Sequence, residues 1–251
     1  MTAIRGTDVS IRTQDGTADA YFTHPADGTA HPAVVLYMDA FGLRPQLKAM
    51  ADRLAEAGYA VLAPNVFYRH GSAPVVPLPE FIADADRPAL FEPIFPLMGD
   101  LTGDVVARDS AAWLDWLATR PEAAPGPVGT AGYCMGARLA LLTAGHHPGR
   151  VAAAAGFHGA GLATDAPDSP HLLADRITAE LYFGHADNDP SMPPEQIERL
   201  DKALSEAGVT QHAEVYADAA HGYTMADTER FDAGSAERHW TALLDLFDRT
   251  L

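Results

Sequence analysis

The sequence contains one cysteine, Cys134, among 251 residues, so no disulfide can form within the chain. Basic residues are also scarce, because 17 Lys and Arg stand against 34 Asp and Glu and give a formal net charge of −17. A field of this sign repels phosphate backbones and anionic lipid headgroups, which argues against nucleic acid and membranes as partners. The scarcity of cysteine is in keeping with a reducing compartment.

Long apolar runs are missing as well. No stretch approaches the roughly 18 apolar residues that a membrane-spanning helix needs, and the first residues contain no run suited to a signal peptide. We therefore expect a cytoplasmic protein. Hydrophobic residues make up 47% of the chain and charged residues 20%, which suffices for a large core. No segment resembles a linker, so residues 1–251 are expected to form one domain.

The sequence also lacks the spacings of common cofactor sites. No pair of histidines or carboxylates stands at metal-ligand spacing with a cysteine partner. The glycine-containing segment 156–161 does not have the spacing of a dinucleotide-binding loop. We expect neither a metal nor an organic cofactor.

Strand-like and helix-like segments alternate along the chain, which is typical of a mostly parallel sheet with helices on both faces. The apolar run 33–38 predicts a buried strand, whereas 45–57 places Leu47, Met50 and Leu54 on one helical face. Further strands are expected over 9–12, 18–23, 59–63, 128–131, 151–155, 180–183 and 212–216, and further helices over 104–119, 135–144, 193–207 and 235–249.

Residues 65–98 interrupt this alternation. The segment combines six prolines with bulky apolar residues and shows little regular pattern. A long insertion of this kind is commonly a lid or a binding loop in a compact domain. The alternative is a packed surface excursion without a role.

The strongest chemical signal is the sequence Gly132, Tyr133, Cys134, Met135, Gly136, which lies between a predicted strand and a predicted helix. This is the pattern of a nucleophile elbow with cysteine in place of serine. The sharp turn needs small neighbours two residues to either side, and it places the sulfur at a helix N-terminus, where a thiolate is favoured. The amide of Met135 becomes a candidate oxyanion donor, and Tyr133 a candidate for substrate contact.

A cysteine nucleophile needs a base and an orienting acid, which follow it in the order acid, histidine in α/β-hydrolases. His221 is the best candidate for the base, because it follows the last predicted strand and precedes the closing helix. The acid should follow the strand 180–183, where Asp187 and Asp189 both stand. The residues alone do not decide between these two carboxylates. His158 also follows a strand and is a weaker candidate for the same pocket.

The chain resembles the dienelactone hydrolase family almost from end to end, on the segments MDAFG at 38–42, GYAVLAP at 58–64, GYCMG at 132–136 and AAHG at 219–222. The resemblance implies an α/β-hydrolase fold and selects Asp189 as the triad acid. It also implies that Asp39 holds the thiol protonated until substrate arrives, and that Ala40 supplies the second oxyanion donor. Aspartate is one methylene shorter than the glutamate that is common in the family.

One departure from the family bears on the substrate. Family members carry an arginine shortly after the catalytic histidine to bind a substrate carboxylate, and here Met225 stands in its place. Arg69 or Arg87, both in the insertion, are candidates for a replacement. An apolar or aromatic ester is the other interpretation.

The predicted reaction is hydrolysis of an activated ester or lactone through a thioester on the cysteine. A thiolate is a good leaving group as well as a good nucleophile, so simple alkyl esters and amides should be poor substrates. The alternatives are a general carboxylesterase or acyltransferase with the same triad, or a binding module without turnover. The only partner expected is a small-molecule ester or lactone, and the chain is expected to be a monomer or a homodimer.

Overall fold

Eight strands form one sheet in the computed structural model, which describes residues 2–251. The first two strands are long, and β1 is mostly exposed whereas β2 is mostly buried; every residue of β3 and β4 is buried. The strands are β1 (Ile4–Thr13), β2 (Gly16–Pro25), β3 (Ala33–Tyr37), β4 (Ala60–Pro64), β5 (Val128–Tyr133), β6 (Val151–Phe157), β7 (Glu180–Ala186) and β8 (Gln211–Tyr216).

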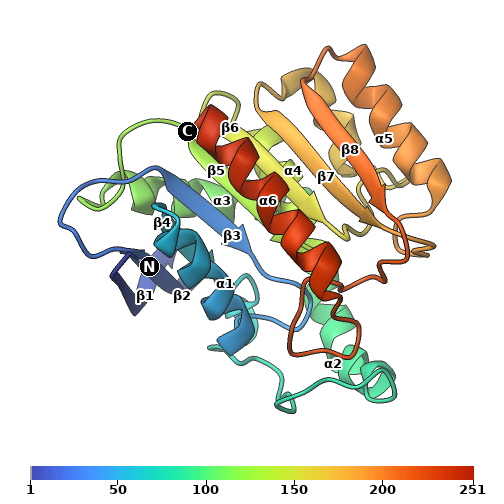
Figure 1. Ribbon diagram of the computed structural model, residues 1–251, viewed down its shortest axis with the longest axis horizontal. Helices are drawn as coiled ribbons and strands as arrows, with labels where there is room; N and C mark the ends of the chain where they lie inside the picture. Colours follow the sequence, from blue (N-terminus) through green and yellow to red (C-terminus); the bar gives the residue numbers. More distant parts are fainter. Residues whose placement is uncertain (1) are drawn as a thin grey trace.

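The strand order is β1-β2-β4-β3-β5-β6-β7-β8 (Figure 1). β1 and β2 pair antiparallel with each other, and β2 pairs antiparallel with β4, while the other pairs are parallel. The chain adds β4 on one side of β3 and then adds β5 on the other side. Such a reversal opens a crevice at the carboxyl ends of the strands, where ligands bind in open α/β sheets.

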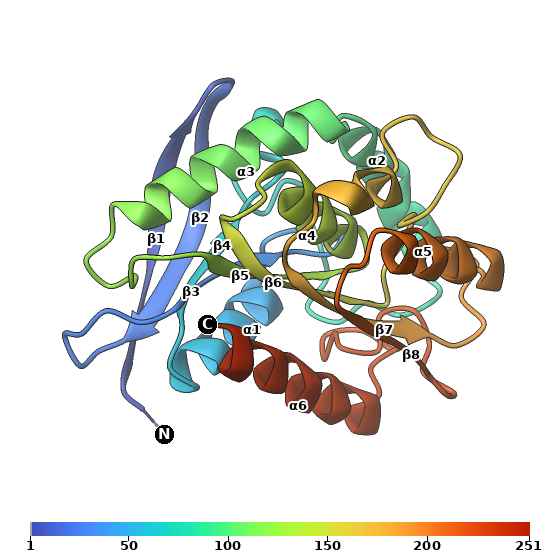
Figure 2. The same ribbon diagram turned by 90° about the horizontal axis from the view of Figure 1, so that it is seen from above.

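Helices cover both faces of the sheet, with α3, α4 and α5 on one face and α1 and α6 on the other (Figure 2). The side chain of Asp232 caps α6 by accepting a hydrogen bond of 2.7 Å from the amide of Ser235. The predicted mostly parallel sheet with helices on both faces is confirmed. The covering helices are α1 (Pro45–Glu56), α3 (Gly103–Ala118), α4 (Met135–His146), α5 (Pro194–Glu206) and α6 (Ala233–Thr250).

The insertion is more regular than the sequence pattern predicts. Its second half forms α2 (Arg87–Gly99), and its first half contains the short 3-10 helix η1 (Tyr68–His70). Proline is compatible with the first turn of a helix, where Pro88 stands. The apolar residues of α2 do not share one face, and only Ile94 is buried. This explains why no helical periodicity is visible in the sequence.

A second 3-10 helix, η2 (Pro170–Arg176), precedes β7. Among residues 2–251, no helix has the length and apolar character needed to cross a membrane.

Candidate active site

The site is built around the sharp turn from β5 into α4. Cys134 occupies this turn with φ 56° and ψ −119°, a strained conformation for a residue with a side chain. A Cβ at Gly132 would lie 2.0 Å from the carbonyl oxygen of Gly136, and a Cβ at Gly136 would lie 2.5 Å from that of Met38. The two glycines therefore allow the first turn of α4 to pack directly against β5 and the end of β3.

His221 lies on the loop after β8, and its Nδ1 is 2.6 Å from Oδ2 of Asp189, which follows β7. The other oxygen of Asp189 accepts a hydrogen bond of 2.8 Å from the amide of Ser191. Asp187 instead accepts a hydrogen bond from the amide of Asp218, 3.1 Å away. Of the two carboxylates that the sequence left open, the structure brings Asp189 to the histidine and uses Asp187 to hold a backbone turn.

The charges of this cluster favour a protonated imidazole. Burial lowers the pKa of His221, but the neighbouring Cys134 and Asp189 outweigh burial and raise this pKa to about 10. Burial raises the pKa of Asp189, but hydrogen bonding to His221 and Ser191 outweighs burial, and its pKa is lowered overall. An imidazolium beside the sulfur favours the thiolate, which is the nucleophilic form of cysteine.

Two backbone amides are placed to bind an oxyanion. The amide of Met135 lies in the first turn of α4, where helical amides have no partner in their own helix. The amide of Ala40 donates no hydrogen bond to any other group in the described part of the chain. Asp39 lines the pocket beside Ala40, and its carboxylate is paired with the buried guanidinium of Arg44.

A small pocket surrounds the sulfur, and two residues of α2 cover it. Arg87 lies over the rings of Phe41 and Phe91, with its central carbon 5.3 Å and 5.5 Å from their centroids. The closest carboxylate to its guanidinium is that of Asp84, 4.0 Å from Nε. Burial and the nearby Arg230 lower the pKa of Arg87. The lining residues are Asp39, Ala40, Phe41, Arg87, Phe91, Cys134, His158, His221, Gly222, Met225 and Thr228.

Two candidates from the sequence lie elsewhere. Arg69 binds Asp15 and Asp109 at 2.6 Å and 2.8 Å and does not line the pocket. The ring of Tyr133 points into the core, where its hydroxyl is 3.2 Å from Nε2 of His239. The structure therefore does not bring either side chain to the sulfur.

His158, the weaker of the two histidine candidates from the sequence, lines the same pocket as His221. It has a positive φ of 37°, and its ring lies edge-on to that of His221 with centroids 5.2 Å apart. Its Nε2 is 2.7 Å from Oγ1 of Thr224. Burial lowers the pKa of His158 well below its ordinary value, and the nearby His221 lowers it further, so the ring is neutral. Its position after β6 was the only signal in the sequence.

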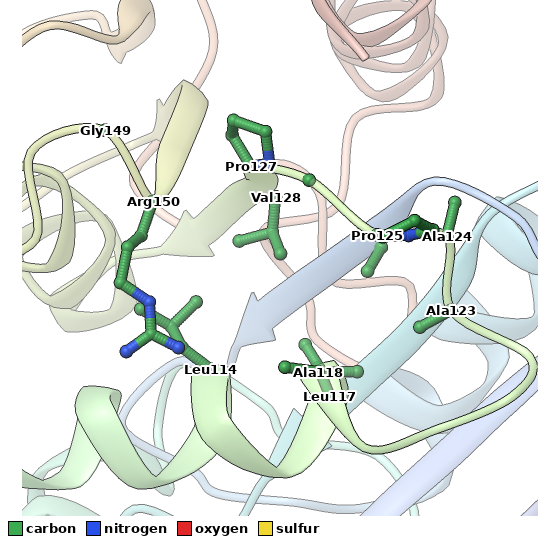
Figure 3. A pocket seen from close by; sticks show the side chains of 12 residues that line it. Leu114, Leu117, Ala118, Ala123, Ala124, Pro125, Pro127, Val128, Gly149 and Arg150 are labelled. Atoms are coloured by element: carbon green, nitrogen blue, oxygen red, sulfur yellow. The ribbon is translucent and has the colours of Figure 1, made fainter.

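A second hollow opens at the opposite ends of the strands, beside the start of β5 (Figure 3). Its lining is apolar apart from Arg150, which forms an ion pair of 2.8 Å with Asp115. The lining contains neither a nucleophile nor a base. Within residues 2–251, no group of three His, Cys, Asp or Glu side chains is arranged to hold a metal ion. The reactive groups are thus concentrated at the carboxyl ends of the strands.

Comparison with known proteins shows which family the chain belongs to. The model of the "Dienelactone hydrolase family" matches residues 18–251. Carboxymethylenebutenolidase of Rhodococcus opacus is 29% identical over 241 residues, which cover 94% of this chain and 88% of that protein. The crystal structure of the dienelactone hydrolase-like promiscuous phosphotriesterase P91, from metagenomic libraries, matches with a TM-score of 0.79 at 25% identity and covers 99% of both chains.

Proposed function

Because the chain belongs to the dienelactone hydrolase family, whose members are hydrolases with the α/β-hydrolase fold, we propose that it cleaves activated esters or lactones with Cys134 as nucleophile, His221 as base and Asp189 as the orienting acid. The observation that carries this proposal is the position of His221. Its ring lines the same small pocket as the sulfur, and its Nδ1 lies 2.6 Å from the Asp189 carboxylate. This is the arrangement that a nucleophile, base and acid need for acyl transfer.

In the proposed reaction, the Cys134 thiolate attacks the carbonyl carbon, and the amides of Ala40 and Met135 bind the oxyanion that forms. Collapse of this intermediate breaks the bond to the leaving oxygen, which takes the proton of the His221 imidazolium. A thioester on Cys134 remains. Water then attacks the thioester while His221 removes a proton from the water, and the thiolate leaves. The cycle consumes one water and releases an acid and an alcohol or enol from an open-chain ester, or one ring-opened acid that carries the hydroxyl or enol group from a lactone.

The leaving group decides which esters can react. The tetrahedral intermediate can expel either the thiolate or the oxygen of the ester, and it expels the better leaving group. A simple alkoxide is a poorer leaving group than a thiolate. The intermediate formed from a simple alkyl ester therefore expels the thiolate and reverts to substrate. An enol ester, an aryl ester or a strained lactone releases a stabilised oxygen and goes forward to the thioester. We therefore expect turnover to follow the acidity of the leaving alcohol.

The two carboxylates after β7 can be separated by matched substitutions. Asp189→Asn should lower kcat for an aryl acetate by about 10²- to 10⁴-fold, because the amide cannot hold the histidine in the required tautomer and charge state. Asp187→Asn should change kcat by less than about threefold, since Asp187 binds only the amide of Asp218. Steady-state hydrolysis by both variants gives the comparison. Equal losses in the two variants would contradict the assignment of Asp189.

Arg87 is the side chain of the pocket best suited to bind a carboxylate on the substrate. Its side chain is only 13% exposed and has no carboxylate closer than 4.0 Å. The lowered pKa of Arg87, caused first by burial and then by Arg230, means that an added anion would stabilise the charged form. Phe41, Phe91 and Met225 supply apolar surface around it. An ester that carries both a carboxylate and a flat apolar part fits this lining.

Arg87→Met should raise KM for a dienelactone that carries a carboxylate by about 10- to 100-fold, because a charge-assisted hydrogen bond is worth about 1.5–3 kcal/mol. KM for a neutral aryl acetate should change little. Arg69→Met is the matched control from the same insertion, and it should lower the thermal midpoint without changing KM for either substrate. A similar loss on charged and neutral substrates in Arg87→Met would contradict carboxylate binding.

Access to the sulfur requires movement of α2. Cys134 is only 9% exposed, and Arg87 and Phe91 of α2 cover the pocket. Ile94 is the only fully buried residue of α2, and its other apolar contacts with the core are made by partly buried side chains. We propose that α2 acts as a lid that opens to admit substrate and closes to exclude water from the thioester.

A panel of a dienelactone and an aryl acetate tests the function as a whole. Turnover of the dienelactone by the wild-type protein would support a dienelactone-hydrolase-like enzyme. Turnover of the aryl acetate alone would point to a general carboxylesterase, and transfer to an added alcohol in place of water would point to an acyltransferase. Absence of turnover on a wide panel of esters and thioesters would favour the alternative that the protein is a binding module without turnover.

A further inference from the structure

A buried arginine joins two loops of the active site. Arg44, at the N-terminus of α1, places Nη1 at 2.6 Å and Nη2 at 3.1 Å from the two carboxylate oxygens of Asp39. The same guanidinium places Nε at 2.6 Å and Nη2 at 3.1 Å from the oxygens of Asp227. The side chain of Arg44 is 5% exposed and that of Asp39 is 6% exposed. The guanidinium is thus a buried cation shared between two carboxylates, one of which lines the catalytic pocket.

Three hydrogen bonds fix the orientation of the Asp39 carboxylate. Oδ1 accepts hydrogen bonds from Arg44 and from the amide of Phe41, which is 3.1 Å away, and Oδ2 accepts the second bond from Arg44. A carboxylate held by an arginine in this bidentate manner is fixed in its orientation. Asp39 therefore stands beside the pocket as a fixed anion, and Arg44 compensates its charge.

The arginine also fixes the loops that carry reactive groups. Asp39 precedes Ala40, whose amide is a proposed oxyanion donor, and Asp227 lies on the loop that follows His221. The carbonyl oxygen of Asp227 accepts a hydrogen bond of 2.9 Å from the amide of Ile82 in the insertion. Arg44 consequently connects the oxyanion loop, the histidine loop and the base of the segment that leads to α2.

We propose that Arg44 is a positioning residue that fixes the carboxylate of Asp39 and balances its charge beside Cys134, and that it thereby favours the thiolate over the thiol. This inference rests on the proposed function, because it concerns the same cysteine. It differs from the expectation drawn from the family resemblance, in which the acid after β3 keeps the thiol protonated at rest. In this chain, loss of Arg44 would leave the charge of Asp39 unbalanced next to the sulfur and would disfavour the thiolate.

The pH dependence of alkylation by iodoacetamide reports the ionisation of the thiol, whereas the absolute rate also depends on access to the pocket. Cys134 is the only cysteine in the chain, so the reaction reports this sulfur alone. The reagent is neutral, and Arg87 therefore does not attract it. The charged and titratable groups that face the sulfur are Asp39 after β3, Arg87 from α2, His158 after β6 and His221 after β8. The pH at the midpoint of the alkylation–pH curve is the quantity to compare between the wild type and the variants.

Arg44→Met should move the midpoint of the alkylation–pH curve upward by at least about one pH unit, so that the rate at pH 6 falls at least about tenfold. The double variant Arg44→Met/Asp39→Asn should return the curve to that of the wild type, because the unbalanced charge is gone. Arg53→Met is the matched control on the same helix, since Arg53 binds Glu237 at the surface, and it should leave the curve in place.

A lowered thermal midpoint in Arg44→Met with an unchanged alkylation curve would overturn the proposal and leave Arg44 a purely structural residue. Failure of Asp39→Asn to restore the curve would overturn it as well. If Arg44→Met does not fold, Arg44→Gln with and without Asp39→Asn gives the same comparison, because glutamine removes the positive charge but keeps a hydrogen-bond donor for the two carboxylates. Absence of ester hydrolysis in the wild type would contradict the proposed function alone, since alkylation needs no substrate.

Discussion

Replacing Cys134 by alanine is expected to lower hydrolysis of every substrate by a factor on the order of 10⁶, the loss typical of removing the nucleophile from a triad. The reason is that the remaining groups can bind and polarise a carbonyl but cannot form the thioester. Steady-state hydrolysis of an aryl acetate by the wild type and by Cys134→Ala measures the loss directly.

A second measurement shows whether the lost step is covalent. Rapid quenching of the wild type with excess aryl acetate should give an intact mass that is larger by one acetyl group, and Cys134→Ala should give none. Because the neighbouring Cys134 is one cause of the raised pKa of His221, this pKa should also fall in the variant, which a proton NMR titration of the imidazole detects. Hydrolysis that survives in Cys134→Ala would exclude the cysteine as nucleophile.

The second large effect concerns the elbow itself. Gly132→Ala would place a methyl group 2.0 Å from the carbonyl oxygen and 2.2 Å from the carbonyl carbon of Gly136. Both atoms belong to the backbone and cannot move without lifting the first turn of α4 off β5. We expect a loss of stability above about 4 kcal/mol, which is exceptional for a single substitution, and no hydrolysis.

The thermal midpoint should accordingly fall by at least about 8 °C, as measured by circular dichroism. Gly99→Ala is the matched control, because a Cβ at Gly99, in the last turn of α2, has no neighbouring atom within 4 Å. Its midpoint should stay within about 2 °C of the wild type. A mild effect of Gly132→Ala would mean that the strand and helix are less tightly apposed than the structure indicates.

The central strands β3 to β7 could be predicted from the sequence because they are buried on both faces. Runs such as 33–38 are short and apolar at every position, which indicates buried strands, whereas helices such as α1 and α6 carry one apolar face with a period of about 3.6 residues. The predicted strands 9–12 and 18–23 are longer in the structure, where they span Ile4–Thr13 and Gly16–Pro25. Strand ends depend on pairing with a neighbour, which a single sequence does not display.

The candidate site was less predictable, because several of its parts depend on contacts between distant segments. Asp187 and Asp189 are equivalent in local sequence, and only the position of His221 after β8 distinguishes them. Arg44 looks like an ordinary residue before a helix until the fold brings Asp227 to it, 183 residues later. Helix α2 could not be predicted from hydrophobic periodicity, because its apolar residues do not lie on one face.

The reversal of strand order between β3 and β5 has a consequence for how this protein can change over evolution. The helices that follow these two strands, α1 and α4, leave toward opposite faces of the sheet (Figure 2). The opening between them is produced by the path of the backbone, and no side chain had to be made smaller to create it. The groups that line it come from separate connections, after β3, β5, β6 and β8 and from α2. A new substrate preference can therefore arise by replacing one connection, while the hydrogen bonds of the sheet and the turn that carries the sulfur stay as they are.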